Sequence, residues 1–150
     1  FDLHEVLYQV TQLYGVNDRV KLDCTPLLNP VLINADRTHI NRLFTNLIQN
    51  AIQAVSEEKI AIVEVNEELL ANKILVKVKD NGMGIPEELR PQIFTPNFTT
   101  KTSGTGLGLA MCKGIVEQAK GEIWFETKAG EGSTFFVELP VVGTPLDRPC

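Results

Sequence analysis

The sequence is poor in cysteine and has neither a long apolar run nor an excess of positive charge. Its three cysteines, Cys24, Cys112 and Cys150, lie far apart and form no CxxC pair, so neither a disulfide framework nor a zinc site is indicated. This cysteine usage makes a reducing cytoplasm the simplest setting, and no run is long enough to span a membrane. The net charge of −5 argues against a nucleic-acid binder or direct membrane contact, because such surfaces gather Lys and Arg.

Several familiar motifs are also missing. His4 and Glu5 do not begin an HExxH zinc motif, because position 8 is Tyr8, and the Pro expected soon after a phosphoacceptor His-Glu is absent. The glycines between positions 104 and 108 lack the Gly-Lys-Ser/Thr of the Walker pattern and the third glycine of a dinucleotide fingerprint. The chain also begins without Met, so we expect a fragment of a longer protein.

What is present fits one globular domain. The 150 residues are 43% hydrophobic and 22% charged, which is ordinary for a domain that buries a core. Apolar periodicity and turn residues predict alternating helices and strands. The expected elements, in order, are a helix over 1–14, strands over 19–24 and 31–34, a helix over 37–56, strands over 60–65 and 74–78, a short helix from Pro86, a helix over 107–118, strands over 122–127 and 133–139, and a tail over 141–150.

The helix over 37–56 carries an unusual polar stripe opposite its apolar arc. The stripe consists of His39, Arg42, Asn46, Gln49, Asn50 and Gln53. A solvated helix face normally carries Lys and Glu rather than four amides and one Arg. Asn46 and Asn50, one turn apart, each present a neutral oxygen that suits a hard cation shared with substrate phosphates. Taken alone, the stripe favours a solvated face.

The run from Asp80 to Pro86 follows a predicted strand. Asp and Asn with Gly are common turn residues, but Pro86 suits the first turn of a helix, so a strand-to-helix junction is predicted. Gly82 and Gly84 would leave room for a flat ligand. Asp80 would then accept a hydrogen bond from an exocyclic amine such as that of adenine, or remain a turn residue if no base binds.

The run from Thr99 to Leu109 places glycines and hydroxyls before a helix. Small residues let backbone N–H groups approach a ligand, and a helix start favours an anion, so phosphate is the expected ligand. A flexible loop without a ligand is the alternative. Phe94 is expected in the core and Phe98 nearer this run. Three further residues are expected to cover the core: Trp124, Phe136 and Val137.

Five segments in order resemble the N, G1, F, G2 and G3 boxes of sensor histidine kinases. They are Asn46-Leu-Ile-Gln-Asn50-Ala, Asp80-Asn-Gly-Met-Gly84, Phe94-Thr-Pro-Asn-Phe-Thr-Thr-Lys101, Gly104-Thr-Gly-Leu-Gly-Leu109 and Gly130-Glu-Gly-Ser-Thr134. The chain resembles the catalytic ATP-binding domain of these kinases, a GHKL-type domain shared with type II topoisomerases and MutL-type ATPases. The resemblance extends over residues 1–140, with 141–150 as a C-terminal tail.

The resemblance implies a Bergerat fold, an α/β sandwich in which a mixed sheet of about five strands is covered on one face by three helices. It implies ATP and Mg²⁺ as cofactors, with Asp80 on the adenine amine, Asn50 on the metal and Asn46 beside it. Thr99 to Thr105 would form a lid that is ordered only with nucleotide. The residues implied in ATP binding are Asn50, Asp80, Gly82, Gly84, Phe98, Thr99, Thr100, Lys101, Gly104, Thr105, Gly106, Leu107, Gly108, Leu109 and Thr134.

The resemblance also implies an activity. Asn46, Asn50 and Lys101 are the implied catalytic residues, and transfer of the γ-phosphoryl group to a histidine is favoured over hydrolysis because Asn46 is a poor base. The implied partners are an upstream histidine-containing dimerisation domain and a response regulator, the isolated domain being monomeric and the parent protein compatible with an inner-membrane anchor. Two alternatives are a serine-directed anti-sigma kinase and a non-catalytic nucleotide-sensing module. Asn97, where Phe is commoner, and Gln53, where a charged residue is frequent, depart from the family pattern.

Overall fold

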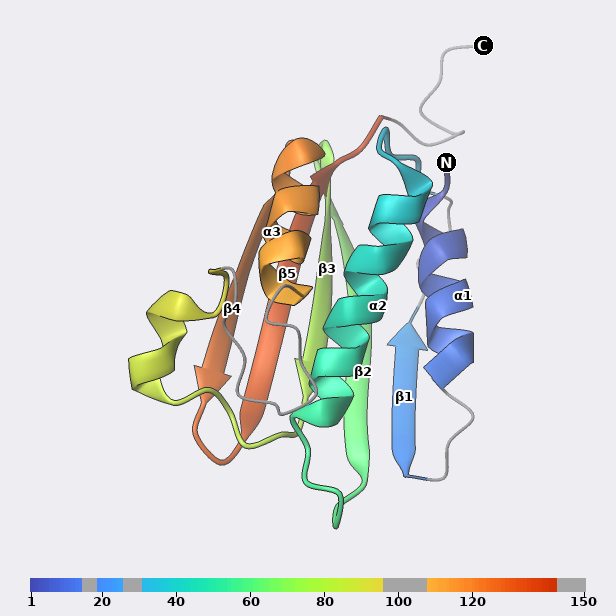
Figure 1. The fold of residues 1–150 in the computed structure, drawn as a ribbon. Helices are drawn as coiled ribbons and strands as arrows, with labels where there is room; N and C mark the ends of the chain where they lie inside the picture. The colour runs from blue at the N-terminus through green and yellow to red at the C-terminus, as the bar shows by residue number, and fades with distance from the viewer. Residues whose placement is uncertain (15–18, 26–30, 96–107, 143–150) are drawn as a thin grey trace.

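The computed structural model describes residues 1–14, 19–25, 31–95 and 108–142. These residues form a layer of helices against one sheet (Figure 1). The helices are α1 (Leu3–Tyr14), α2 (Arg37–Gln53) and α3 (Gly108–Gln118), with a short 3₁₀ helix η1 (Glu87–Gln92). The strands are β1 (Val20–Thr25), β2 (Ala61–Leu70), β3 (Lys73–Asp80), β4 (Glu122–Lys128) and β5 (Gly132–Pro140).

The sheet is mixed and its strands lie in the order β1-β2-β3-β5-β4. β1 pairs in parallel with β2, whereas the β2–β3, β3–β5 and β4–β5 pairs are antiparallel. The helix α3 therefore lies between β3 and β4 in sequence, and β5 returns to the centre of the sheet. This crossover brings the end of β3 beside the start of β5, and the candidate site is built there.

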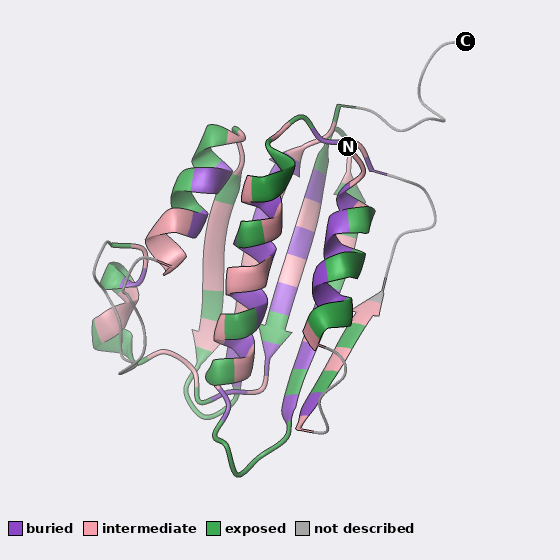
Figure 2. Ribbon diagram, turned by 45° about the vertical axis from the view of Figure 1, so that its right-hand side comes forward, coloured by how far each residue is buried: buried purple, intermediate pink, exposed green. Residues whose placement is uncertain are grey.

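The three α-helices cover one face of the sheet, as the resemblance implies (Figure 1). Figure 2 shows that their buried residues face the strands and that their exposed residues face outward. Asp36 caps α2 by accepting hydrogen bonds from the backbone N–H groups of Thr38 and His39. The apolar arc predicted for α2 is buried at Ile40, Leu43, Phe44, Leu47, Ile48 and Ala51.

The prediction that residues 31–34 form a strand of the sheet is wrong. The described residues there form an isolated bridge between Leu32 and Asp2, with hydrogen bonds from the Leu3 N–H to the Val31 carbonyl and from the Ile33 N–H to the Phe1 carbonyl. Val31 and Ile33 are buried beneath the start of α1. The burial of Val31 and Ile33 thus comes from one short contact with the residues before α1. Such a contact gives the same apolar alternation as a strand of the sheet.

Two of the three residues expected to cover the core lie elsewhere. Val137 is fully buried against the helices, but Trp124 and Phe136 are half-buried and stack at a centroid distance of 5.3 Å. They are register partners, and alternation along β5 places Phe136 on the face opposite Phe135 and Val137. Trp124 and Phe136 therefore cover the sheet face that carries no helix.

The remaining described elements agree with the predictions to within a few residues, except that β2 continues five residues beyond its predicted end at residue 65. β2 and β3 form the predicted antiparallel pair, η1 follows Pro86, and β4 and β5 close the sheet. Phe94 packs against the core beside Phe125 and Phe135, with ring centroids 6.0 and 6.3 Å away. In the part of the chain that the structure describes, no helix combines the length and apolarity needed to cross a membrane.

Candidate nucleotide site

Asp80 is the buried carboxylate at the end of β3. It is 3% exposed, and its Oδ1 accepts hydrogen bonds from the backbone N–H of Gly82 at 2.8 Å and of Ser133 at 3.2 Å. The first bond is an Asx-type contact two residues along the chain, which Asp readily makes before a glycine turn. The second joins β3 to β5. Two N–H donors thus fix the direction of this carboxylate.

The glycines after Asp80 are required by close packing. A Cβ at Gly82 would lie 2.6 Å from the Ala54 carbonyl oxygen at the end of α2. Gly84 has a φ of +81° and a Cβ there would lie 2.6 Å from the Lys128 carbonyl oxygen in β4. The loop is thereby held between the end of α2 and the β4–β5 turn. Both glycines shape the loop beside Asp80, whether or not a base binds there.

Two hydroxyls next to Asp80 were not among the predicted site residues. Thr127 of β4 accepts a hydrogen bond from the Ile85 N–H at 2.9 Å, and its Oγ1 lies 2.8 Å from the Oγ of Ser133. Ser133 in turn donates its N–H to Asp80. Thr127 and Ile85 are 42 residues apart in the sequence, so no local sequence pattern predicts their contact.

Thr134, which was predicted to lie near the adenine pocket, is the register partner of Lys79 and Glu126. Its neighbours Ser133 and Phe135 are buried on the helix-covered face, so alternation puts the Thr134 side chain on the opposite face. The contact to Asp80 comes from Ser133 instead.

The polar stripe of α2 divides between two neighbours. Gln49 donates to the hydroxyl of Tyr14 on α1 at 2.6 Å. Asn46 donates through Nδ2 to the Arg42 carbonyl at 2.9 Å, and its Oδ1 would lie 3.3 Å from a Cβ on Gly108. Asn46 therefore borders the first residue of α3, while Gln49 serves the contact between α1 and α2.

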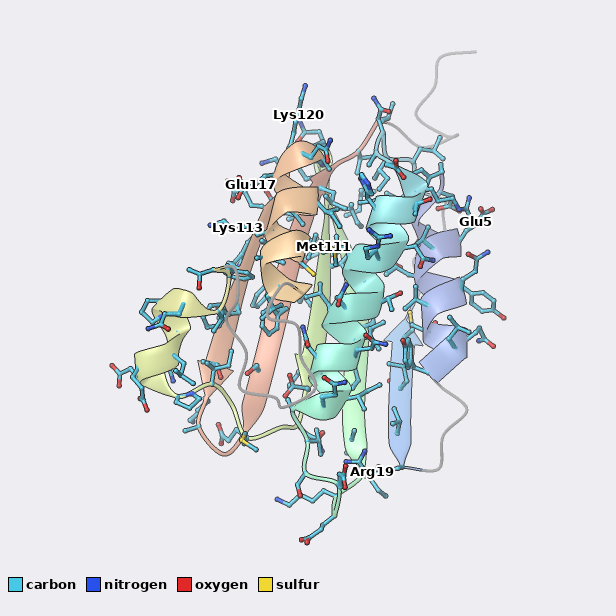
Figure 3. All side chains as sticks on the ribbon, viewed as in Figure 1. Glu5, Arg19, Met111, Lys113, Glu117 and Lys120 are labelled. Carbon is cyan, nitrogen blue, oxygen red and sulfur yellow. The ribbon has the colours of Figure 1, made fainter. Side chains whose placement is uncertain are left out.

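The start of α3 is the second part of the candidate site. Gly108 begins the helix, Leu109 and Met111 pack against the core, and Cys112 is fully buried. The outer side of α3 is polar: Lys113 is exposed on the side away from α2, with its Nζ 6.0 Å from the Phe94 ring centroid (Figure 3). The first turn of α3 thus lies against Asn46.

Eight predicted site residues lie outside the described residues. They are Phe98, Thr99, Thr100, Lys101, Gly104, Thr105, Gly106 and Leu107. The expectation of a lid over 99–105 also falls on this segment. The predicted site residues that are described are Asn46, Asn50, Asp80, Gly82, Gly84, Gly108, Leu109 and Thr134.

The described thiols are unsuited to nucleophilic chemistry. Burial raises the pKa of Cys112 to about 12. Burial, followed by the charges of Glu67 and Asp23, raises the pKa of Cys24 to about 11. Both are protonated at neutral pH, and the thiolate is the reactive form. Among the described residues no group of three His, Cys, Asp or Glu side chains could hold a metal ion.

The candidate site thus combines a buried carboxylate at a strand end, a glycine loop beside it, and an asparagine-bearing helix against the start of another. Residues 35–143 match the family described as histidine kinase-, DNA gyrase B-, and HSP90-like ATPase, so the chain belongs to this family. The chain is 35% identical over 151 residues to sporulation kinase C of Bacillus subtilis. It is 44% identical over 115 residues to the sensor histidine kinase ZraS of Escherichia coli.

Solved structures of histidine kinases have a similar fold. The catalytic domain of histidine kinase ThkA, in a nucleotide-free form, has a TM-score of 0.78 and 36% identity, over 93% of each chain. The mycobacterial sensor histidine kinase MprB, at 22% identity and a TM-score of 0.82, supports the fold alone. The chain covers 93% of itself but 33% of sporulation kinase C, and 77% of itself but 24% of ZraS. It thus spans a third or less of the length of these curated relatives.

Proposed function

We propose that this domain binds Mg-ATP and transfers the γ-phosphoryl group to a histidine of a dimerisation domain encoded upstream. The observation that carries the proposal is the buried Asp80 carboxylate, directed by two backbone N–H groups at the end of β3. Such a carboxylate can accept a hydrogen bond from the exocyclic amine of adenine. We assign the Asp80 carboxylate to the amine.

The phosphates belong at the other end of the site, along α2 and the start of α3. The amide oxygens of Asn46 and Asn50 lie one turn apart on α2, and Asn46 borders Gly108. Mg²⁺ is typically coordinated by a few protein oxygens together with oxygens of the substrate phosphates. Neutral amide oxygens beside a helix start that can bind an anion are compatible with such coordination. Asn50 would hold the ion, which when bound neutralises phosphate charge. Backbone N–H groups at 106–108 and the Lys101 ammonium would hold the phosphates.

Transfer rather than hydrolysis is proposed because phosphoryl transfer needs positioning and charge neutralisation more than a protein base. Asn46, one turn before Asn50, carries an amide that donates to the Arg42 carbonyl and has no basic nitrogen to activate water. A carboxylate at this place would favour hydrolysis. The acceptor histidine would be presented by another domain; in this chain His4 pairs with the Glu67 side chain at 2.8 Å.

A response regulator is the proposed second partner. One solved structure is of histidine kinase ThkA in complex with response regulator protein TrrA, and this chain covers 42% of that kinase chain at 35% identity and a TM-score of 0.74. We propose that the protein containing the present chain likewise binds a response regulator. The regulator would receive the phosphoryl group from the histidine and not from this domain.

The test is phosphoryl transfer in trans. The acceptor domain from the same coding frame is mixed with this chain and γ-labelled Mg-ATP, and acid-labile, base-stable label on the acceptor is measured. Asn50→Ala is expected to reduce transfer by at least about a hundredfold, as for loss of a transition-state charge contact. Gln49→Ala, one residue away but directed at Tyr14, is the matched control.

Three results would contradict the proposal. Acid-stable label on a serine would favour an anti-sigma-type kinase. ATP binding without transfer to any acceptor would favour a nucleotide-sensing module. Equal transfer by wild type and Asn50→Ala would remove Asn50 from the metal site.

A further inference from the structure

We propose that Thr127 is a positioning residue for base recognition, acting through Ser133 and Ile85 on the orientation of Asp80. The inference rests on the proposed function, because it concerns the same nucleotide site. Thr127 is not expected to touch the nucleotide. It holds both ends of the loop that carries the recognising carboxylate.

The hydrogen-bond inventory of Thr127 makes the case. Its Oγ1 accepts from the Ile85 N–H at 2.9 Å, lies 2.8 Å from the Ser133 Oγ and lies 3.4 Å from the Gly132 carbonyl oxygen. A hydroxyl has one proton and two acceptor positions. All three contacts are satisfied together when Ser133 donates to Thr127 and Thr127 donates to Gly132. The Thr127 hydroxyl is then fully used.

This network fixes the loop from both sides. At its first end, Asp80 Oδ1 accepts from the N–H groups of Gly82 and Ser133. At its second end, the Ile85 N–H is tied to Thr127, which is bonded to the side chain of the same Ser133. Ser133 is 7% exposed and its N–H bond to Asp80 is buried, whereas the two Thr127 bonds to Ile85 and to the Ser133 hydroxyl are part-buried. Any shift of Ser133 therefore moves the donor that directs Asp80.

At the Ile85 end of the loop, the Ile85 carbonyl accepts a hydrogen bond from Arg90 Nε at 3.1 Å. Met83 donates to the Ala54 carbonyl at 3.3 Å and accepts from the Gly130 N–H at 2.9 Å, so the middle of the loop is anchored to α2 and to the β4–β5 turn. The Ile85 N–H has a side chain as its acceptor instead. Removing that hydroxyl leaves a polar donor without its partner at the loop end, which frees the loop next to Asp80.

The experiment compares Thr127→Val, which keeps the shape and removes the hydroxyl, with Thr127→Ser, which keeps the hydroxyl. Thr11→Val is the matched control, because Thr11 is a buried threonine on α1 whose hydroxyl donates to the Tyr8 carbonyl at 2.9 Å. Two quantities are measured: Mg-ATP affinity by calorimetry, and amide hydrogen exchange at Ile85 without nucleotide. Exchange tests the network itself and does not depend on ATP binding.

The expected results separate a hydroxyl effect from general destabilisation. Thr127→Val weakens Mg-ATP binding about tenfold, the scale of one buried hydrogen bond, and speeds Ile85 exchange. Thr127→Ser restores both, and Thr11→Val changes neither. If Thr127→Val fails to fold, Ser133→Ala replaces it, since this variant removes the other hydroxyl and keeps the backbone bond to Asp80; its expected loss is several-fold.

The outcomes also distinguish the two proposals. If the wild-type chain does not bind Mg-ATP, the proposed function falls, and the role of Thr127 in it falls as well. If the wild type binds and Thr127→Val binds equally well, only the positioning role is overturned. Equal losses in Thr127→Val and Thr127→Ser would overturn it too, because the hydroxyl would not be the group that matters.

Discussion

Replacing Asp80 with Asn changes one atom of the candidate base site and keeps an oxygen that can accept the bonds from the Gly82 and Ser133 N–H groups. The two backbone donors bond to Oδ1, at 2.8 Å from Gly82 and 3.2 Å from Ser133, and an Asn side chain retains that oxygen. We therefore expect the free energy of unfolding to change by less than about 1 kcal/mol, the net value of one ordinary hydrogen bond. The second carboxylate oxygen becomes an NH₂ group, which donates and does not accept.

The consequence for ATP is large because the exocyclic amine of adenine also donates. A hydrogen bond to a charged group contributes about 1.5–3 kcal/mol, and the variant opposes two donors in its place. Each 1.4 kcal/mol is a factor of ten, so Mg-ATP affinity should fall by about 30-fold or more. Inosine triphosphate carries an oxygen where adenine has the amine. The Asp80→Asn variant should therefore lose its preference for ATP over inosine triphosphate.

Calorimetric titration of both nucleotides into wild type and variant measures the effect, with thermal unfolding as the check on folding. An unchanged ATP affinity in a folded Asp80→Asn variant would refute the assignment of Asp80 to the base. A parallel loss for ATP and inosine triphosphate would also refute it, since the carboxylate would then act on something other than the amine.

Two further predictions concern the frame around the site. Gly132→Ala should lower the free energy of unfolding by about 2–4 kcal/mol in urea melts, because φ is +125° and the Cβ would lie 2.1 Å from the Asp80 carbonyl oxygen. Gly130→Ala is the control: φ is +80° and nothing lies within 4 Å of the Cβ, so it should lower the free energy of unfolding by only about 1 kcal/mol. Equal losses of stability in the two variants would contradict the packing argument. The raised pKa of Cys112, about 12 against 9.0 for the free thiol, means that the unfolded chain loses its proton first, so this contribution to stability is present below pH 9 and is lost as the pH rises toward 12. Urea melts from pH 8 to 10 should therefore show a shallower fall for Cys112→Ala than for wild type, and identical slopes would contradict burial as the cause.

Much of the fold could be predicted because its signals are local. The apolar arc of α2 and its Asp36 cap place that helix, and strand alternation places β2, β3 and β5. The pattern over 31–34 was misleading because Val31 and Ile33 are buried by one short contact to the chain before α1. Trp124 was misleading for another reason, since an aromatic residue on an uncovered sheet face looks like core in sequence.

A candidate site residue could be predicted where its type and local sequence indicate its chemistry. Contacts between residues from distant segments could not be predicted in this way. Asp80 stands at a strand end before glycines, which is visible in the sequence. The role of Thr127 depends on Ile85, 42 residues away, and on the register that brings Ser133 beside it. The division of the α2 stripe between Tyr14 of α1, which Gln49 contacts, and the start of α3, which Asn46 borders, depends on the packing of the helices and is not visible in the stripe itself.

The central claim is that nucleotide binds between α2, α3 and the end of β3, on the helix-covered side of the sheet. Titration of a non-hydrolysable Mg-ATP analogue into the ¹⁵N-labelled chain, followed by amide chemical shifts, tests it most directly. We predict the largest shifts at Asn50, at Gly82 and at Gly108, with little change at Lys77 and Phe136 on the opposite face. Shifts centred on Phe136 with none at Gly82 would contradict this account.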